Sequence, residues 1–201
     1  MFYIEKVNKN PSITGIILAG GKSLRMGTDK GLVIFRDKPL VQYSIDLLGQ
    51  FCDRILISSN NQAYSVFGYE IVPDQMEGAG PMAGISACLS NSKTELNLIL
   101  SCDMPLADRI VFQTLIDLSD GYTFVVPLDA IGRIEPLCAI YKTESLKIMQ
   151  KMLSSQRYRM TELFRHAPAR MVTPEEYPGP FYDKWFMNVN TIGDLEAAGN
   201  F

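Results

Sequence analysis

The sequence has few residues of the kinds that build metal centres and disulfide frameworks. It contains a single histidine, His166, in 201 residues, which excludes a site built from several imidazoles and disfavours a histidine-based nucleophilic triad. Its four cysteines form no C-x-x-C pair, and each lies in an apolar context: Cys52, Cys88, Cys102 and Cys138. This pattern favours reduced cysteines in the core over a zinc site or a disulfide.

Positive charge and long hydrophobic runs are also lacking. The net charge is −3, whereas a protein that binds nucleic acid over a broad surface needs a basic excess, so we expect no nucleic-acid partner. No apolar run approaches the length of a membrane span, and the first ten residues, MFYIEKVNKN, lack a signal-peptide core. We therefore expect a cytoplasmic protein that does not associate with membranes.

Length and composition are those of an ordinary globular protein. With 47% hydrophobic and 20% charged residues, the chain can bury a sizeable core. The simplest division is one domain over residues 1–201, in which residues 1–12 form a short, flexible polar lead.

A glycine turn rich in positive charge follows the first apolar run. Ile16, Ile17 and Leu18 resemble a buried parallel strand, and Ala19-Gly20-Gly21 comes directly after it. Glycines let backbone N–H groups approach a bulky ligand. The next residues supply cations and hydroxyl groups: Lys22, Ser23, Arg25, Thr28 and Lys30. Together these features predict a phosphate-binding loop.

Neither of two common phosphate-binding patterns fits this loop. In the P-loop pattern the first glycine would fall on Ile16, and the dinucleotide pattern fails because Gly20 and Gly21 are adjacent. A plain strand-to-loop turn with a solvated basic surface therefore remains an alternative.

Carboxylates follow two later strand-like runs. Residues 96–101 form the most apolar run and lead directly to Asp103, and residues 69–72 lead to Asp74. Open α/β sheets bind ligands at the carboxyl ends of their strands. Asp103 is therefore a candidate Mg²⁺ ligand, which would act together with substrate phosphates. The alternative is that Asp103 caps a helix predicted over residues 110–118.

The whole pattern alternates between strands and helices. Further strands are predicted at residues 32–35, 54–57, 122–127 and 136–141, and helices are predicted to begin near residues 39, 81, 145 and 191. Gly80 and Gly84 flank the start of the second of these helices, where free N–H groups suit an anionic ligand. We predict a single α/β domain with a mostly parallel central sheet, whose cleft brings together Gly20, Asp74 and Asp103.

Several blocks of sequence resemble one family. L-A-G-G-K-S-x-R-M-G-x-D-K is similar to the signature of nucleotidyltransferases that activate sugars and cofactors. V-P-D, G-x-G-P-M-A-G, C-D-M-P, P-L-C-A-I-Y and F-M-N-V-N-T-x-x-D-L follow it. From Thr14 to Leu195, these blocks resemble those of the molybdenum cofactor guanylyltransferases in the same order.

The resemblance implies a Rossmann-like nucleotidyltransferase fold and transfer of GMP from GTP to molybdopterin, with release of pyrophosphate. It places the nucleotide at Leu18, Ala19, Gly20, Lys30, Asp74 and Asp103, with Gly21, Gly80 and Gly84 in the same glycine loops. Some family members have a nucleotide-binding asparagine where this chain has Ser58. Asp103 matches the family's Mg²⁺ ligand, and Arg25 and Lys30 would offset phosphate charge. Molybdenum-insertion proteins and molybdoenzyme apoproteins are the implied protein partners.

The acceptor is expected near the end of the chain. If residues 186–191 are extended, Asn188 and Asn190 share one face and can hydrogen-bond a pterin ring. Alternatively, Asn190 shapes the turn into the last helix. Two other functions remain open: the same fold acting on another pair of substrates, such as CTP with molybdopterin or a sugar 1-phosphate, and a nucleotide-binding regulator without catalytic activity.

Overall fold

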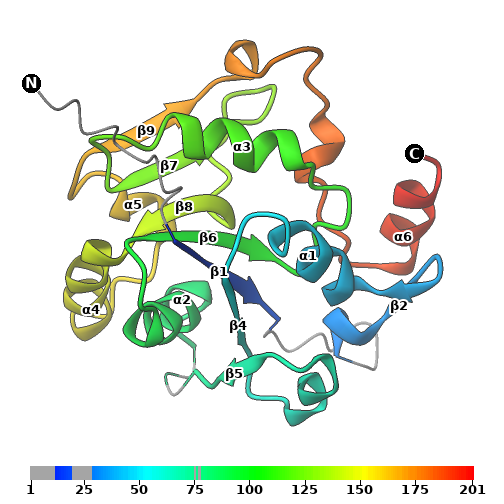
Figure 1. The fold of residues 1–201 in the computed structure, drawn as a ribbon, viewed down its shortest axis with the longest axis horizontal. Coiled ribbons are helices and arrows are strands. Elements are labelled where there is room, and N and C mark those ends of the chain that lie inside the picture. The colour runs from blue at the N-terminus through cyan, green and yellow to red at the C-terminus, as the bar shows by residue number, and fades with distance from the viewer. Residues whose placement is uncertain (1–11, 20–28, 75, 77) are drawn as a thin grey trace, which may run out of the picture.

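A seven-stranded sheet forms the centre of the molecule (Figure 1). The computed structural model describes residues 12–19, 29–74, 76 and 78–201. In spatial order the strands are β5 (Glu70–Val72), β4 (Arg54–Ser58), β1 (Ile13–Leu18), β6 (Leu96–Ser101), β8 (Cys138–Lys142), β7 (Phe124–Pro127) and β9 (Ala169–Val172). Only β8 runs antiparallel to its neighbours β6 and β7. The predicted α/β fold with a mostly parallel sheet is confirmed.

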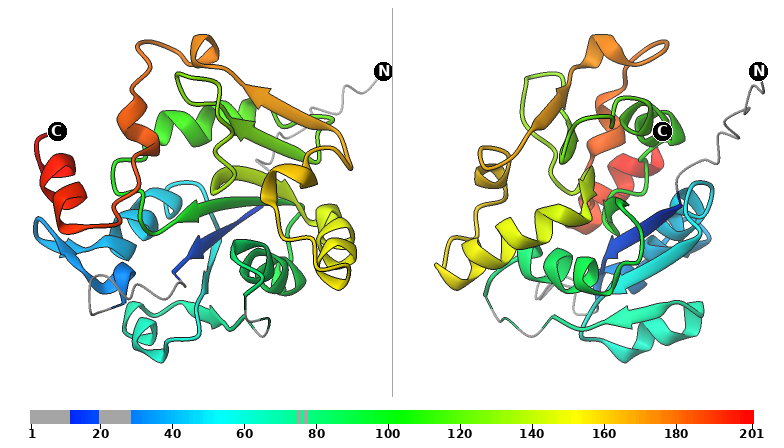
Figure 2. Two further views of the ribbon diagram at one scale, coloured as in Figure 1. Left: turned by 180° about the vertical axis from the view of Figure 1, so that it is seen from behind. Right: turned by 60° about the vertical axis from the view of Figure 1, so that its left-hand side comes forward.

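Helices cover both faces of this sheet (Figures 1 and 2). The helices α1 (Leu40–Leu48) and α3 (Arg109–Asp117) pack on one face, whereas α2 (Pro81–Asn91), α4 (Leu146–Ser154) and α5 (Met160–Leu163) pack on the other. Successive residues of a strand point to opposite faces. In β1, Ile17 therefore joins the core beneath α1 and α3, and Ile16 joins the core beneath α2 and α4. All four cysteines are free, as predicted, and Cys88, Cys102 and Cys138 are buried, whereas Cys52 is only partly buried.

Four parallel strands end at the same edge of the sheet. Leu18 pairs with both Ser58 and Ser101, and Ser58 pairs with Val72. The main-chain N–H of Cys102 extends this register by donating to the Leu18 carbonyl at 3.1 Å. The residues that follow β1, β4, β5 and β6 must therefore meet at this edge, where the ligand cleft was predicted.

The strand predicted at residues 32–35 differs in the structure. Lys30–Leu32 forms a 3-10 helix, η1, and only Ile34–Phe35 is extended, as strand β2. It pairs with β3 (Lys38–Pro39) in a two-stranded hairpin outside the main sheet. The last helix, α6 (Ile192–Gly199), lies beside this hairpin in both views (Figures 1 and 2). A small apolar cluster holds the two together: Phe35, Leu40, Val189 and Ala198.

Several short elements were not predicted. Strand β9 extends the sheet beside β7, although its sequence, A-R-M-V, contains a charged residue. The remaining elements are the 3-10 helices η2 (Gln62–Phe67), η3 (Thr143–Ser145), η4 (Pro174–Glu176) and η5 (Asp183–Phe186). Residues 174–183 were predicted to form a loop. Helix η4 is a single short turn at the start of this segment, and most of the rest is irregular, as predicted. Such elements are too short for a periodic pattern to identify them.

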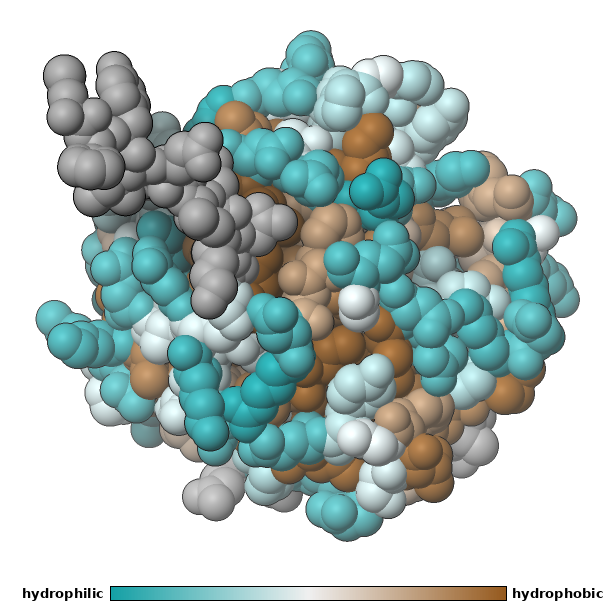
Figure 3. Space-filling view, in the orientation of Figure 1, coloured by the Kyte–Doolittle hydropathy of each residue, from teal (hydrophilic) through white to brown (hydrophobic). Residues whose placement is uncertain are grey.

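The surface is mixed in polarity. In the orientation of Figure 1, hydrophobic residues appear in the middle of the face and hydrophilic residues surround them (Figure 3). Within the described part of the chain, no helix has the length and apolar character needed to cross a membrane.

Candidate active site

A cleft of about 910 Å³ opens at the edge where the parallel strands end. Its volume is in the range of pockets that hold nucleotide-sized ligands. Six of the predicted site residues line it: Leu18, Ser58, Asp74, Gly80, Gly84 and Asp103. These residues come from four strand ends and from the start of α2, so the sheet order brings them together.

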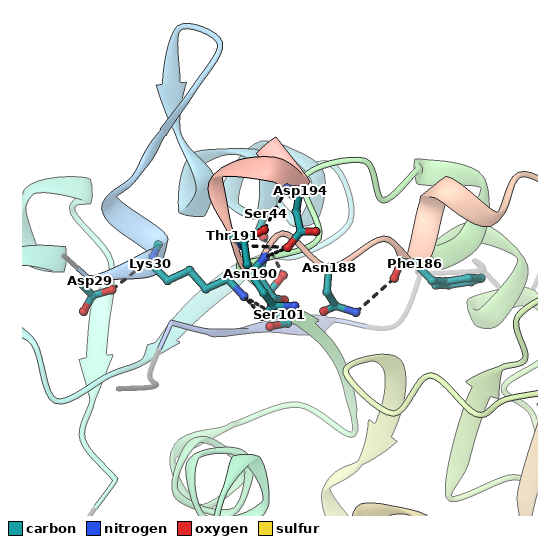
Figure 4. Close-up of polar contacts among 11 residues, drawn as sticks. Asp29, Lys30, Ser44, Ser101, Phe186, Asn188, Asn190, Thr191 and Asp194 are labelled. Atoms are coloured by element: carbon teal, nitrogen blue, oxygen red, sulfur yellow. Dashed lines mark hydrogen bonds and ion pairs between the residues drawn. The ribbon is translucent and has the colours of Figure 1, made fainter. Parts of the chain in front are cut away.

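Three distant segments converge on one side of this cleft. The ammonium Nζ of Lys30 lies 2.6 Å from Oδ2 of Asp103 and 2.6 Å from Oδ1 of Asn190. The side chains of Lys30 and Asp103 are only 16% and 17% exposed, so solvent screens this ion pair weakly. Figure 4 shows Lys30 reaching across to the segment that carries Asn190.

Among the described residues, only one of the two carboxylate oxygens of Asp103 has a hydrogen-bond partner. Its Oδ1 atom is buried and has no hydrogen-bond partner among the described residues. The alternative role as a helix cap is wrong, because it is Asp108 that caps α3, by accepting from the Ile110 N–H at 2.9 Å. The main-chain oxygen of Asp103 accepts from the Val189 N–H at 2.8 Å, which ties the last segment to the end of β6. One oxygen of this carboxylate is therefore available to a ligand.

Two glycines shape the start of α2 for different reasons. Gly80 has φ 64° and ψ −156°, a backbone conformation that essentially only glycine adopts, and it precedes Pro81 at the first helical position. A Cβ on Gly84 would lie 2.3 Å from Oγ of Ser58, so glycine is what lets α2 approach the end of β4. Ser58 is consequently only 5% exposed.

Asp74 and Ala19 are held by local hydrogen bonds. Oδ1 of Asp74 accepts from the Met76 N–H at 2.8 Å, and this contact shapes the turn after β5. Ala19 is buried, and its N–H donates to the Ser58 carbonyl at 3.0 Å. Asp74 lines the cleft, whereas Ala19 is not among the described residues that line it.

Comparison with known proteins identifies the family. The model of the MobA-like NTP transferase domain matches residues 15–171. The chain belongs to this family. A probable molybdenum cofactor guanylyltransferase of Flavobacterium johnsoniae is 33% identical over 165 residues, which are 82% of this chain and 87% of that protein. A probable molybdenum cofactor guanylyltransferase of Clostridium perfringens is 31% identical over 188 residues, 90% of this chain and 92% of the relative.

A solved structure has the same fold. It is the molybdopterin-guanine dinucleotide biosynthesis protein A of Archaeoglobus fulgidus, which superimposes with a TM-score of 0.75 at 20% sequence identity. The match covers 93% of this chain and 97% of the other, so the two share the domain fold over nearly their whole length.

In this MobA-like chain burial alternates over residues 188–190, although Phe186, the first residue of the expected extended segment, belongs to helix η5. Val189 is fully buried, whereas Asn188 is half-buried and Asn190 is exposed. The amide of Asn188 donates to the Phe186 carbonyl at 3.3 Å (Figure 4). Thr191 caps α6 and Asp194 completes a capping box, so the side chain of Asn190 is not needed for that turn and bonds Lys30 instead.

Some predicted site residues are not described by the structure, and some residues that line the cleft were not predicted from the sequence. Gly20, Gly21 and Arg25, predicted to bind or act on the nucleotide, lie outside the described residues. The cleft has further lining residues outside the predicted set, among them Ser59, Asn60, Ser101 and Leu137. The first three are polar residues at or just after a strand end, which is the signal that would have identified them.

Glu135 is a half-buried carboxylate close to the same edge. It precedes the turn into β8, and its N–H donates to the Pro127 carbonyl at 3.0 Å. Burial, and then the charges of Asp129 and Asp103, raise the pKa of Glu135 from 4.5 to about 7. The ionised form of Glu135 is therefore disfavoured in the folded protein.

Glu135→Gln is expected to stabilise the protein at high pH only. Because the folded-state pKa is above the unfolded value, ionised Glu135 costs stability, and this cost appears as the pH rises from about 4.5 to about 7. At pH 8 the variant should be about 1 to 2 kcal/mol more stable, allowing for solvent screening of a half-exposed group. At pH 4.5 the two proteins should differ little. Urea unfolding at both pH values measures the two stabilities. The control is Glu196→Gln, because Glu196 is exposed. An equal stability difference at both pH values would contradict the prediction.

Proposed function

We propose that this protein transfers GMP from GTP to the terminal phosphate of molybdopterin. The observation that carries this proposal is the Lys30–Asp103 pair, with its unpartnered carboxylate oxygen, at the edge of a cleft of nucleotide size. The curated relatives named above, at 31% and 33% identity, carry names that specify a guanylyltransferase of the molybdenum cofactor, which supports guanine as the base.

Asp103 is suited to hold Mg²⁺ together with the substrate. Among the described residues, no group of three or more His, Cys, Asp or Glu side chains is placed to bind a metal ion by itself. Mg²⁺ is commonly held by one or two carboxylates, substrate phosphate oxygens and water, so one carboxylate with a buried free oxygen fits this donor set. When bound there, the ion would neutralise charge on the phosphates.

The reaction needs positioning and charge neutralisation more than a protein nucleophile. A phosphate oxygen of molybdopterin bonds to the α-phosphorus of GTP, the bond from that phosphorus to the β-bridging oxygen breaks, and pyrophosphate leaves. The ammonium of Lys30 is held where it can offset the charge of the triphosphate, and Arg25 is proposed to do the same from the glycine-rich loop. A single histidine in the chain is compatible with this chemistry.

Nucleotide contacts are proposed along the cleft. On one side, the nucleotide would lie against the backbone of Leu18, Ala19, Gly20 and Gly21. On the other side, it would contact Ser58, Asp74, Gly80 and Gly84. The buried position of Ser58, close to Gly84, leaves Asn60 as the more exposed polar side chain after β4.

GTP should be the preferred nucleotide. We expect GTP with Mg²⁺ to support pyrophosphate release at least about tenfold better than ATP, CTP or UTP, because a site that bonds one base edge leaves polar groups unpaired with another. A panel of the four triphosphates with molybdopterin measures this. Preference for CTP would indicate that the protein transfers CMP instead of GMP. Turnover only with a sugar 1-phosphate would show that molybdopterin is not the acceptor. Nucleotide binding without pyrophosphate release would indicate a regulator.

Asn188 and Asn190 are proposed to contact the acceptor. They lie beside Asp103, where the reacting phosphate must arrive, and the amides can match the donors and acceptors of a pterin ring. Because Asn190 also bonds Lys30, its substitution would disturb the nucleotide side as well. Asn188 is therefore the cleaner test.

Asn188→Ala is expected to raise the KM for molybdopterin about fivefold or more, since losing a hydrogen bond to a buried partner costs about 1 to 3 kcal/mol. GTP affinity should stay within about twofold. Steady-state kinetics and calorimetry test this, with Gln113→Ala as the control, because that amide bonds Asp117 on the exposed face of α3. Loss of GTP binding together with molybdopterin use would mean that the segment is structural.

A further inference from the structure

Asp29, the residue before Lys30, is bound through both of its carboxylate oxygens. Oδ1 accepts from the Gly31 N–H at 3.2 Å and from the hydroxyl of Tyr64. Oδ2 accepts from Nδ2 of Asn61 at 2.9 Å. Two of these donors are side chains more than thirty residues away along the chain, 32 for Asn61 and 35 for Tyr64. Asp29 is therefore anchored to another part of the fold, in addition to capping η1.

The donors come from the segment that follows β4. Oδ1 of Asn61 accepts from the Ala63 N–H at 3.0 Å and so caps η2, which orients its Nδ2 group towards Asp29. Tyr64 is fully buried in η2. Its hydroxyl passes so close to Gly31 that a Cβ there would lie 2.3 Å from it, which only glycine avoids.

The hydroxyl of Tyr64 stays protonated and can therefore always donate a hydrogen bond to Asp29. Burial, and then its hydrogen bond with Asp29, raise the pKa of this phenol. Its proton therefore stays in place, and Asp29 remains an acceptor.

This network holds the residue that directly precedes Lys30. A lysine side chain is flexible, with about 2 kcal/mol of rotamer entropy, so its head group is well placed only if the backbone beneath it is held. Asp29 fixes that backbone on one side of Lys30, and the ammonium then lies 2.6 Å from both Asp103 and Asn190. Asn61 directly follows Asn60, and its N–H donates to Oγ of Ser59 at 3.1 Å. Ser59 and Asn60 line the cleft, so the network also joins the cleft wall to Lys30.

We propose that Asp29, held by Tyr64 and Asn61, is a positioning residue that keeps Lys30 directed at the phosphates of the bound nucleotide. This inference rests on the proposed function, in which Lys30 contacts the triphosphate. It assigns a role to the segment after β4 that is separate from contact with the nucleotide.

The test compares GTP with GMP binding by calorimetry in Tyr64→Phe and Asn61→Ser. Tyr64→Phe removes only the hydroxyl, whereas Asn61→Ser keeps a capping oxygen for Ala63 and removes the amide donor to Asp29 without adding charge. Each variant should weaken GTP binding about threefold to tenfold more than GMP binding, which is the loss expected from one hydrogen bond. Tyr141→Phe is the matched control, because that buried tyrosine donates to the Pro136 carbonyl at 2.9 Å, away from Lys30.

Repeating both substitutions in Lys30→Ala separates positioning from general damage. If Asp29 acts through Lys30, neither should change the ratio of GTP to GMP affinity any further in that background. An equal loss for both ligands, or an effect that persists without Lys30, would overturn the inference. If Tyr64→Phe fails to fold, Asn61→Ser gives the same comparison. A wild-type protein that binds neither nucleotide would refute the proposed function itself, which is a distinguishable result.

Discussion

Asp103→Asn is expected to fold normally and to lose about 100-fold or more of its metal-dependent turnover, the scale on which one electrostatic group in an active site acts. Asparagine keeps the shape of the side chain, and the main-chain bond from Val189 to residue 103 is unaffected. It removes the charge that pairs with Lys30 and the anionic oxygen, Oδ1, that is proposed to bind Mg²⁺. Pyrophosphate release at increasing Mg²⁺ concentrations measures the loss.

The control for this prediction is Asp108→Asn. Asp108 lies in the same connection between β6 and α3, but its carboxylate caps α3, and asparagine is an equally good cap. That variant should retain nearly full activity and stability. If Asp103→Asn also keeps activity within a few-fold of the wild type, Asp103 does not hold the metal and the proposed mechanism is wrong.

Lys30→Ala is expected to weaken GTP binding about 10-fold to 100-fold, because a hydrogen bond to a charged group contributes about 1.5 to 3 kcal/mol. GMP binding should suffer much less, since the ammonium is proposed to contact the outer phosphates, which GMP lacks. In the free protein Lys30 is held by Asp103 and Asn190, so it is already in place when the nucleotide arrives. Calorimetry with GTP and GMP measures both affinities.

Removing this lysine also leaves Asp103 without its ion-pair partner, so unfolding must be measured in parallel. Lys38→Ala is the matched control, because Lys38 also pairs with a carboxylate, that of Asp46, but lies on the surface beside α1. It should leave both affinities unchanged. An equal loss of GTP and GMP binding in Lys30→Ala would place the ammonium elsewhere in the site.

Hydrophobic patterning in the sequence predicted the central parallel strands and the edge at which the site lies. The apolar runs of β1, β4 and β6 are continuous because parallel strands are buried on both faces, and such runs can be recognised without any knowledge of the fold. Since the carboxyl ends of parallel strands share one edge, the residues after these runs had to meet. For this reason Asp74 and Asp103 were predicted in one cleft and are found lining it.

Tertiary structure alone decided which side chains touch at that edge. The contact of Lys30 with Asn190 joins residues 160 positions apart, and it depends on α6 packing beside the β2–β3 hairpin through a small apolar cluster. The bonds from Asn61 and Tyr64 to Asp29 likewise require η2, which is too short to have a periodic pattern. Strand order and short helices follow from packing across the whole chain, so local sequence does not encode these pairs, although it encodes the strands that bring them near.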